Sequence, residues 1–382
     1  CIHHHVSDRI DPQSHAPHVR TLLCFALEGS GLRRQHKPIF THQAFELLRV
    51  LDIRSIRTLC FPSGVEYMVH LRYLALNACV QSLPASICNL WNLQTLIVEA
   101  PSVVDLPHQI WNMVKLRHLR VNGGFYIPPF REPTNDDHTS ILVNLQTIST
   151  VIVSCSKEED VLARIPNLRK LGCFLGESQV GYKQFPKLDF LKDLETLNVG
   201  CSFFITGPPR FQPLYKFPPN LKKLTLSEFR LPWEEMSTLG RLQNLEVLKL
   251  LDRAFEGPCW ETSDGEFSKL KFLKLRDLDI AQWDASSSHF PSLQRLVLDR
   301  CRELEAIPSS LVDISTLEII EVNFCHRSAN SARQIQEQQQ SMGNDGLKIL
   351  IYPHIEEDRY EIITQNEVDY QIGCWDKNSA GF

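Results

Sequence analysis

Cysteine and histidine are the residue types in this chain with the clearest potential for metal or nucleophilic chemistry. Cys1 stands beside the run His3–His5, a set that could bind a metal ion, although its place at the end of the chain favours a chance grouping. None of the twelve cysteines forms the C-x(2–4)-C pair that zinc fingers use. The sequence also lacks a G-x-x-x-x-G-K-[ST] phosphate loop, an H-E-x-x-H zinc motif and a G-x-S-x-G nucleophile elbow. We therefore assign no catalytic, cofactor-binding or metal-binding residue and expect no enzymatic activity.

A second group of candidates could bind a partner protein through charge. Its members occupy positions that should point outward from short strands, and most of them are basic. This candidate face consists of Tyr73, His118, Arg120, Lys170, Lys223, Lys249, Lys274, Arg276 and Arg295. Carboxylates at comparable positions, such as Asp52, Asp299 and Glu321, are scarce along the middle of the set. A basic stripe of this kind would steer an acidic partner, but exposed strands also carry Lys and Arg for solubility, so both interpretations stay open.

The elements that must position these side chains are copies of Leu-x-x-Leu-x-Leu or an aliphatic variant. Twelve copies begin at Leu48, Leu71, Leu93, Leu116, Leu145, Leu168, Leu194, Leu221, Leu245, Leu270, Leu293 and Leu317. Neighbouring copies are separated by 22 to 29 residues. This element with a period in the twenties is typical of a leucine-rich-repeat solenoid.

Each copy predicts one short strand, because side chains along a strand alternate between its two faces. In the copy LRYLAL, Leu74 and Leu76 should point into the core, whereas Tyr73, Ala75 and Asn77 should point outward. Stacked copies make a parallel sheet on the concave side. The segments LPASICNLWNL, LPHQIWNMVKL and IPSSLVDISTL predict irregular or short-helical returns on the convex side. The predicted fold is an α/β leucine-rich-repeat solenoid, a horseshoe of about 12–14 repeats.

The repeat pattern divides the chain into three segments. We expect a leading segment with a degenerate first repeat over residues 1–45, the solenoid over 46–325, and a cap with an acidic tail over 326–382. The unbroken repeat favours one elongated domain. Within the last segment, ANSARQIQEQQQSMG predicts a helix and LKILIY a strand.

Three stretches depart from the repeat and predict surface loops, at residues 122–144, 200–220 and 252–269. Their aromatic residues could contact a partner at a rim, or the stretches could reflect divergence without function. The doublet Gly123-Gly124 in the first stretch has no Lys after it, so it predicts a turn and not a phosphate site.

Composition limits the compartment and the partners. A net charge of −5 argues against nucleic-acid binding, and no apolar run reaches the length of a membrane span. The N-terminus has no apolar signal region and no initiator Met, so we expect a piece of a longer polypeptide or the product of an incomplete gene. Cysteines at predicted inward positions (Cys24, Cys173) and at buried turn positions (Cys79, Cys301, Cys325) should behave as small hydrophobic residues. Together with the absence of an Asn-x-Ser/Thr site, this favours the cytosol.

Several stretches resemble one protein family. HAPHVRTLLCF and FELLRVLDI are similar to the entry into the repeat domain of plant intracellular immune receptors, and SARQIQEQQQSMGNDGLKI is similar to its exit. The two returns with Leu-Pro at their start are also similar. Over residues 15–352 the chain resembles the coiled-coil, nucleotide-binding, leucine-rich-repeat disease resistance proteins, in particular the late blight resistance homologues of the nightshade family.

The resemblance implies a role in plant defence and innate immunity. In that family the repeat domain holds a nucleotide-binding switch domain inactive and contributes to recognising a pathogen effector, directly or through a guarded host protein. ADP or ATP would bind an upstream domain that this chain does not contain. The implied partners are therefore proteins and not nucleic acid. The resemblance also implies that the chain has no integral membrane segment and is located in the cytoplasm. A stand-alone cytosolic scaffold for signalling proteins remains the main alternative; the substrate receptor of a ubiquitin ligase and an extracellular ectodomain fit less well.

Overall fold

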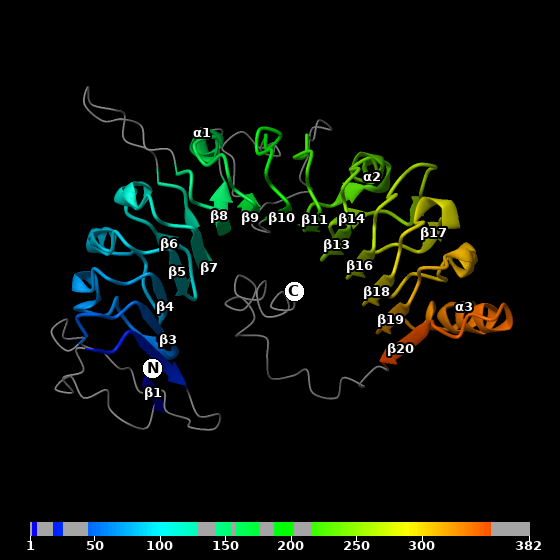
Figure 1. Cartoon of the computed structure of the whole chain (residues 1–382). Coiled ribbons are helices and arrows are strands. Elements are labelled where there is room, and N and C mark those ends of the chain that lie inside the picture. Colours follow the sequence, from blue (N-terminus) through cyan, green and yellow to red (C-terminus); the bar gives the residue numbers. More distant parts are fainter. Residues whose placement is uncertain are drawn as a thin grey trace, which may run out of the picture. The chain divides into compact units, whose positions relative to one another are not determined.

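The computed structural model describes residues 2–5, 18–25, 45–128, 142–153, 157–175, 187–201 and 216–352. The described residues group into two compact units, unit 1 over residues 2–173 and unit 2 over residues 174–352. Both units are built from the same coil, which consists of one strand of a parallel sheet and a return segment (Figure 1). The leucine-rich-repeat architecture predicted from the sequence is therefore present in each unit.

The sheet of unit 1 is parallel in every pair of neighbours with a recorded register. Its order is β1-β2-β3-β4-β5-β7-β8-β9, and the short strand β6 pairs with β7. The bounds are β1 Ile2–His5, β2 Thr21–Phe25, β3 Val50–Thr58, β4 Tyr73–Ala78, β5 Thr95–Glu99, β6 Val104–Asp105, β7 His118–Tyr126, β8 Thr147–Val153 and β9 Lys170–Leu175. The boundary between the units falls inside β9.

The sheet of unit 2 has the order β10-β11-β13-β16-β18-β19-β20 and is also parallel. Its strands are β10 Thr196–Cys201, β11 Lys223–Ser227, β13 Val247–Leu251, β16 Phe272–Arg276, β18 Arg295–Asp299, β19 Ile319–Asn323 and β20 Lys348–Tyr352. Two small parallel pairs lie apart from it: β12 (Leu231–Pro232) with β14 (Phe255–Glu256), and β15 (Cys259–Glu261) with β17 (Gln282–Asp284).

The leucine element forms these strands as predicted. Each strand begins about two residues after the first Leu of its copy, and the second and third aliphatic residues are buried, as Leu74 and Leu76 are in β4. Tyr73 and Asn77 are half-exposed on the other face, which we call the open face. Ala75 was expected to be exposed there but is buried. A methyl group is too short to stand above the larger neighbours that flank it on β3 and β5.

The return segments are short helices on the side of the coil away from the sheet (Figure 1), as the sequence predicts. The three predicted returns form the 3-10 helices η3 (Ala85–Asn89), η4 (His108–Asn112) and η7 (Ser309–Asp313). Each follows a proline, which has no N–H to satisfy and whose fixed φ suits a helix start. The other helices are η2 Val65–Tyr67, α1 Lys157–Leu162, η5 Trp233–Glu235, α2 Met236–Gly240, η6 Ser287–His289 and α3 Ala329–Ser341.

A ladder of asparagine side chains connects successive coils at the edge where the strands begin. Each Asn lies one residue before the first Leu of its copy and donates its amide N–H to a backbone carbonyl of the preceding coil. The donor–acceptor pairs are Asn92 to Val69, Asn144 to Val114, Asn167 to Val143, Asn220 to Lys192 and Asn244 to Pro219, at 2.7–3.3 Å. The ladder satisfies carbonyls that the turns leave without a strand or helix partner.

The doublet Gly123-Gly124 lies inside β7 and not in the predicted turn. It occupies the place where the register of β7 against β8 shifts between Arg120 and Phe125. A Cβ atom at Gly123 would lie 2.0 Å from the carbonyl oxygen of Ser102, and Gly124 has φ of +81°. Glycine is required here because the neighbouring loop approaches the strand too closely for any side chain.

A column of stacked aromatic rings fills the core behind the sheet of unit 2. Trp260 lies between Trp233 and Trp283, with ring centroids 5.1 Å and 5.0 Å away, and the planes of Trp260 and Trp283 differ by only 1°. Phe267 and Phe290 pack against the column edge-on and stack on each other. The aromatic residues of the stretch 252–269 are therefore core residues, and the expectation that they contact a partner at a rim is wrong.

The predicted last helix and last strand are both present. The helix α3 packs on η7 with Ala332, Ile335 and Gln339 buried, and the Gln339 side chain donates hydrogen bonds to the carbonyls of Val312 and Ile314. The strand β20 continues the sheet beside β19. The acidic tail beyond residue 352, most of the stretch 200–220 and the middle of 122–144 lie outside the described residues. No helix in the described ranges has the length and apolarity to cross a membrane.

We predict that Trp260→Ala lowers the free energy of unfolding by about 3–5 kcal/mol, because it removes a fully buried ring from the centre of the column. Trp91→Ala is the matched control, since the Trp91 side chain is 61% exposed, and it should change stability by less than about 1 kcal/mol. Urea unfolding followed by circular dichroism measures both. Equal losses in the two variants would contradict a core role for the column.

Candidate functional site

All nine residues of the candidate face lie on strands of the sheet, but they form one group in each unit. In unit 1, Tyr73 lies on β4, His118 and Arg120 lie on β7, and Lys170 begins β9. In unit 2, Lys223 lies on β11, Lys249 on β13, Lys274 and Arg276 on β16, and Arg295 on β18. In the parallel register Lys249 is directly opposite Lys274, so like charges lie side by side.

A charged cluster surrounds Tyr73 on the open face of unit 1. Arg54 forms a two-pronged contact with the carboxylate of Asp52, with Nη2 to Oδ2 at 2.7 Å, and its Nη1 lies 3.7 Å from the Glu99 carboxylate. Burial, and then the negative charge of Asp52, raise the pKa of the Tyr73 hydroxyl. The Tyr73 end of the candidate face therefore contains balanced charge and a neutral phenol that can donate a hydrogen bond.

The middle of unit 1 is basic instead. His118 is half-buried, and its Nδ1 lies 3.1 Å from the Thr147 hydroxyl. Burial lowers the pKa of His118, and the nearby charges of Arg117, Lys170 and Arg120 lower it further. At neutral pH the imidazole is therefore uncharged, and an incoming anion would favour its protonation.

The expectation that carboxylates are scarce beside the basic residues is wrong for three of them in unit 2. Lys274 lies 3.4 Å from the carboxylate of Asp299, and Arg295 lies 2.7 Å from that of Glu321. Arg276 makes a two-pronged contact with Asp252. Diagonal neighbours on adjacent strands approach closely enough for long side chains to pair, so most of the positive charge here is neutralised within the protein.

Sequence reasoning missed a row of arginines at the edge where the strands begin. They stand directly after the first Leu of their copies, in LRVLDI, LRYLAL, LRHLRV and LRKLGC. This arginine row consists of Arg49, Arg72, Arg117 and Arg169, and all four are exposed. Their side chains form no ion pair within the described residues. The repeated Leu-Arg pair was a usable signal, but only positions further along each strand were considered.

The same position in unit 2 carries alternating charges. Lys222 lies 3.3 Å from Glu195, and Lys271 lies 3.3 Å from Glu246, each across one coil boundary. Unit 2 therefore neutralises this edge, whereas unit 1 leaves it positive. The arginine row therefore carries positive charge that the described residues of unit 1 do not compensate.

A row of exposed apolar side chains lies beside the arginine row. Val69, Trp91, Val114 and Val143 occupy equivalent positions in successive coils and are 38%, 61%, 52% and 51% exposed. The ammonium group of Lys115 lies 5.5 Å from the centre of the Trp91 ring. Apolar side chains next to unpaired cations are a combination that protein interfaces use.

The predicted cysteine positions are largely confirmed. Cys24, Cys173, Cys301 and Cys325 are buried, whereas Cys79 is half-exposed. Burial raises the pKa of the Cys173 thiol to about 12, so it stays protonated and unreactive at neutral pH. The described residues contain no group of three or more His, Cys, Asp and Glu side chains arranged to hold a metal ion.

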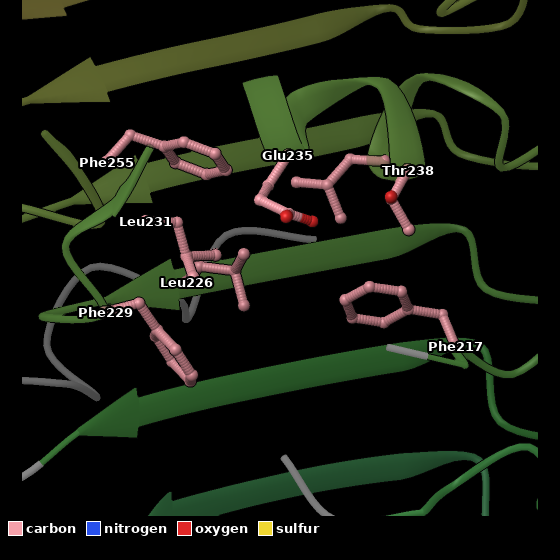
Figure 2. Close-up of a pocket in the computed structure, with 8 residues that line it drawn as sticks. Phe217, Leu226, Phe229, Leu231, Glu235, Thr238 and Phe255 are labelled. Carbon is pink, nitrogen blue, oxygen red and sulfur yellow. The ribbon is translucent and has the colours of Figure 1, made fainter. Parts of the chain in front are cut away.

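A small depression in unit 2 is almost entirely apolar (Figure 2). Its lining comprises Phe217, Leu226, Phe229, Leu231, Glu235, Thr238, Leu239 and Phe255. Glu235 and Thr238 are the polar members, and they contribute no set of converging groups that would orient a small ligand.

Comparison with known families agrees with this architecture. Residues 18–232, more than half of the chain, match the family model described as a leucine-rich repeat region. The chain belongs to the leucine-rich-repeat family.

Similar proteins are plant resistance proteins, as the resemblance predicted. The repeat domain is 36% identical over 324 residues to a putative late blight resistance protein homolog of Solanum demissum, covering 80% of this chain and 40% of that protein. It is 37% identical over 321 residues to the late blight resistance protein R1-A of the same species, covering 80% and 24%. The chain thus spans between about a quarter and two fifths of the length of these curated relatives. Among solved structures, a leucine-rich-repeat protein of Leptospira interrogans aligns at 17% identity with a TM-score of 0.43, covering 87% of this chain and 89% of that one.

The described surface of the repeat domain offers ionic and apolar contacts for a partner. Its unpaired cations include the arginine row in unit 1 and two lysines, Lys223 and Lys249, in unit 2. Both sets would attract carboxylates.

We predict that His118 titrates below its ordinary pKa of 6.5, because burial and three nearby cations disfavour the imidazolium ion. Lys170→Met removes one of those cations and should raise the pKa of His118. The control, Lys348→Met on β20, removes a cation that does not act on His118 and should leave its pKa unchanged. Two-dimensional NMR of the imidazole signals measures both.

The same shift fixes a pH dependence. The pKa of His118 is lower in the folded chain than in the unfolded chain, so the unfolded chain binds more protons near this pH. The free energy of unfolding should therefore decrease as pH falls through 6.5 toward the folded pKa. A His118 titration at or above 6.5 would contradict a basic environment in the middle of unit 1.

Proposed function

We propose that this chain is the repeat domain of a plant intracellular immune receptor and acts in the cytoplasm by binding proteins. In this role it holds a nucleotide-binding switch domain inactive and contributes to recognising a pathogen effector, directly or through a guarded host protein. The observation that carries the proposal is the 36–37% identity over 80% of the chain to late blight resistance proteins. In this division of labour, ADP or ATP would bind another part of the receptor.

The surface chemistry supports a binding role for unit 1 in particular. The arginine row has no internal counter-charge among the described residues, and the apolar row beside it is exposed. A partner that presents carboxylates next to apolar side chains would satisfy both rows together. We assign the contact with the switch domain to this edge.

The expected strength of such a contact suits a switch. Four exposed arginine–carboxylate contacts of about 0.5–1 kcal/mol each would stabilise the closed state by about 2–4 kcal/mol. That corresponds to roughly 30 to 1,000 closed molecules for each open one. A ligand that binds only the open state can reverse a ratio of this size, which is the requirement for activation by an effector.

We predict that the double variant Arg72→Gln/Arg117→Gln binds the rest of the receptor about five- to thirtyfold more weakly, because it removes two ionic contacts of up to about 1 kcal/mol each. The measurement is co-precipitation of the 382-residue chain with the part of the R1-A protein outside the matched region. The control, Lys222→Gln/Lys271→Gln, makes the same change in net charge at the same repeat position in unit 2. Equal recovery of the two variants, or no interaction of the unaltered chain, would overturn the assignment.

A further inference from the structure

The positive charge on the open face of unit 2 is compensated unevenly. Lys274, Arg276 and Arg295 each contact a carboxylate of a neighbouring coil. Lys223 and Lys249, on the adjacent strands β11 and β13, contact no carboxylate in the part of the chain that the structure describes. We call these two residues the lysine pair.

Lys249 occupies an environment that does not favour its charge. Its side chain is half-buried and its Nζ lies 5.8 Å from the centre of the Phe272 ring. In the sheet register it lies between Thr225 and Lys274. Burial lowers the pKa of Lys249, and the charges of Lys274 and Lys223 lower it further. The ring of Phe272 offers only partial compensation for this charge.

The floor beside the lysine pair is apolar. Val247 lies directly opposite Lys223 and next to Phe272 in the register, and both are half-exposed. Strand geometry places the Cα atoms of Lys223 and Lys249 about 8 Å apart. Side chains of this length can bring both ammonium groups to the two oxygens of one carboxylate.

We propose that the lysine pair is a docking subsite for the carboxylate of an Asp or Glu side chain on a partner protein, with an apolar neighbour of that residue resting on Val247 and Phe272. The inference deepens the proposed protein-binding function, on which it rests, but it concerns a different surface from the arginine row. A bound carboxylate supplies the counter-charge that the coil itself supplies to Lys274 through Asp299.

The local charge pattern favours a single carboxylate over a phosphate polymer. Nucleic acid is held by many simultaneous phosphate contacts, whereas three of the five cations of the candidate face in this unit are already engaged within the protein. The two remaining cations, Lys223 and Lys249, lie on neighbouring coils, and their spacing suits the carboxylate of one acidic side chain.

The subsite predicts a measurable difference between binding and stability. Lys249→Met keeps the apolar stem over Phe272 and removes a charge that burial and two lysines disfavour, so the melting temperature should stay the same or rise. If Lys249 served only packing or solubility, Lys249→Met would not keep the melting temperature and at the same time weaken binding of an acidic partner.

The test is NMR of the lysine side chains in the full chain, after reductive methylation with labelled formaldehyde. The probe is a blocked peptide of alternating glutamate and leucine. The signals of Lys223 and Lys249 should shift with added peptide, the Lys249 signal should titrate at higher pH, and the Lys271 signal should shift less. Lys223→Gln and Lys249→Met should each weaken peptide binding roughly five- to tenfold, and Lys271→Gln by less than about twofold.

Two arms define failure. A peptide of alternating lysine and leucine should leave both signals unmoved, and inorganic phosphate at matched ionic strength should shift them less than the acidic peptide does. Unchanged signals with the acidic peptide, or equal shifts with phosphate, would overturn the subsite. Neither result touches the proposed receptor function, which rests on the identity to late blight resistance proteins and whose contact edge the Arg72→Gln/Arg117→Gln comparison tests separately.

Discussion

The contact between successive coils is the constraint on which the whole structure depends. A single coil of about two dozen residues buries its leucines only where another coil covers them, so no coil has a core of its own. Leu74 and Leu76 of β4, for example, have no accessible surface although their own strand is only six residues long. The backbone of each strand is likewise satisfied by the strands before and after it. Because every coil must match its neighbours, equivalent residues recur at a spacing of about 4.8 Å across the sheet.

Because of that spacing, the pattern of charge at one repeat position decides how the surfaces of the two units differ. A basic residue at one repeat position lies close to the residue at the same position in the next coil, well inside the Debye length. Unit 2 resolves the repulsion at the strand-start edge with alternating Lys and Glu, as in the Lys222–Glu195 pair. Unit 1 instead places the neutral Gln94 and Gln146 between Arg72, Arg117 and Arg169. Its arginine row therefore keeps its attraction for an external carboxylate. The lysine pair is the corresponding uncompensated feature on the open face of unit 2. In both places the proposed contact with a partner's carboxylate rests on a cation for which the described residues supply no counter-charge.

The sequence predicted the parts of the structure that repeat. Period and leucine positions located the strands, the returns after Pro84, Pro107 and Pro308, and the inward cysteines, because each depends on a pattern shared by many coils. The nine residues of the candidate face were placed on the sheet for the same reason. What their pattern cannot reveal is the pairing of side chains. Asp299 is opposite Arg276 in the register but contacts Lys274. Arg276 instead contacts Asp252. The backbone of Asp252 has a φ of +46°, which no signal in the local sequence predicts. The core role of Trp260 and the strand position of Gly123 were missed because both arise in the stretches where the repeat is irregular.

The asparagine ladder has a consequence for how this architecture changes length. Asn144 and Asn167 stand in consecutive coils and make the same bond to the coil before them, as do Asn220 and Asn244. At these places the junction on one side of a coil is chemically equivalent to the junction on the other. Removing or duplicating an entire turn of the stack recreates an intact seam, whereas a cut at any other interval does not. Unequal recombination in units of one repeat can therefore extend or shorten the array of surface side chains while leaving the remaining turns correctly joined.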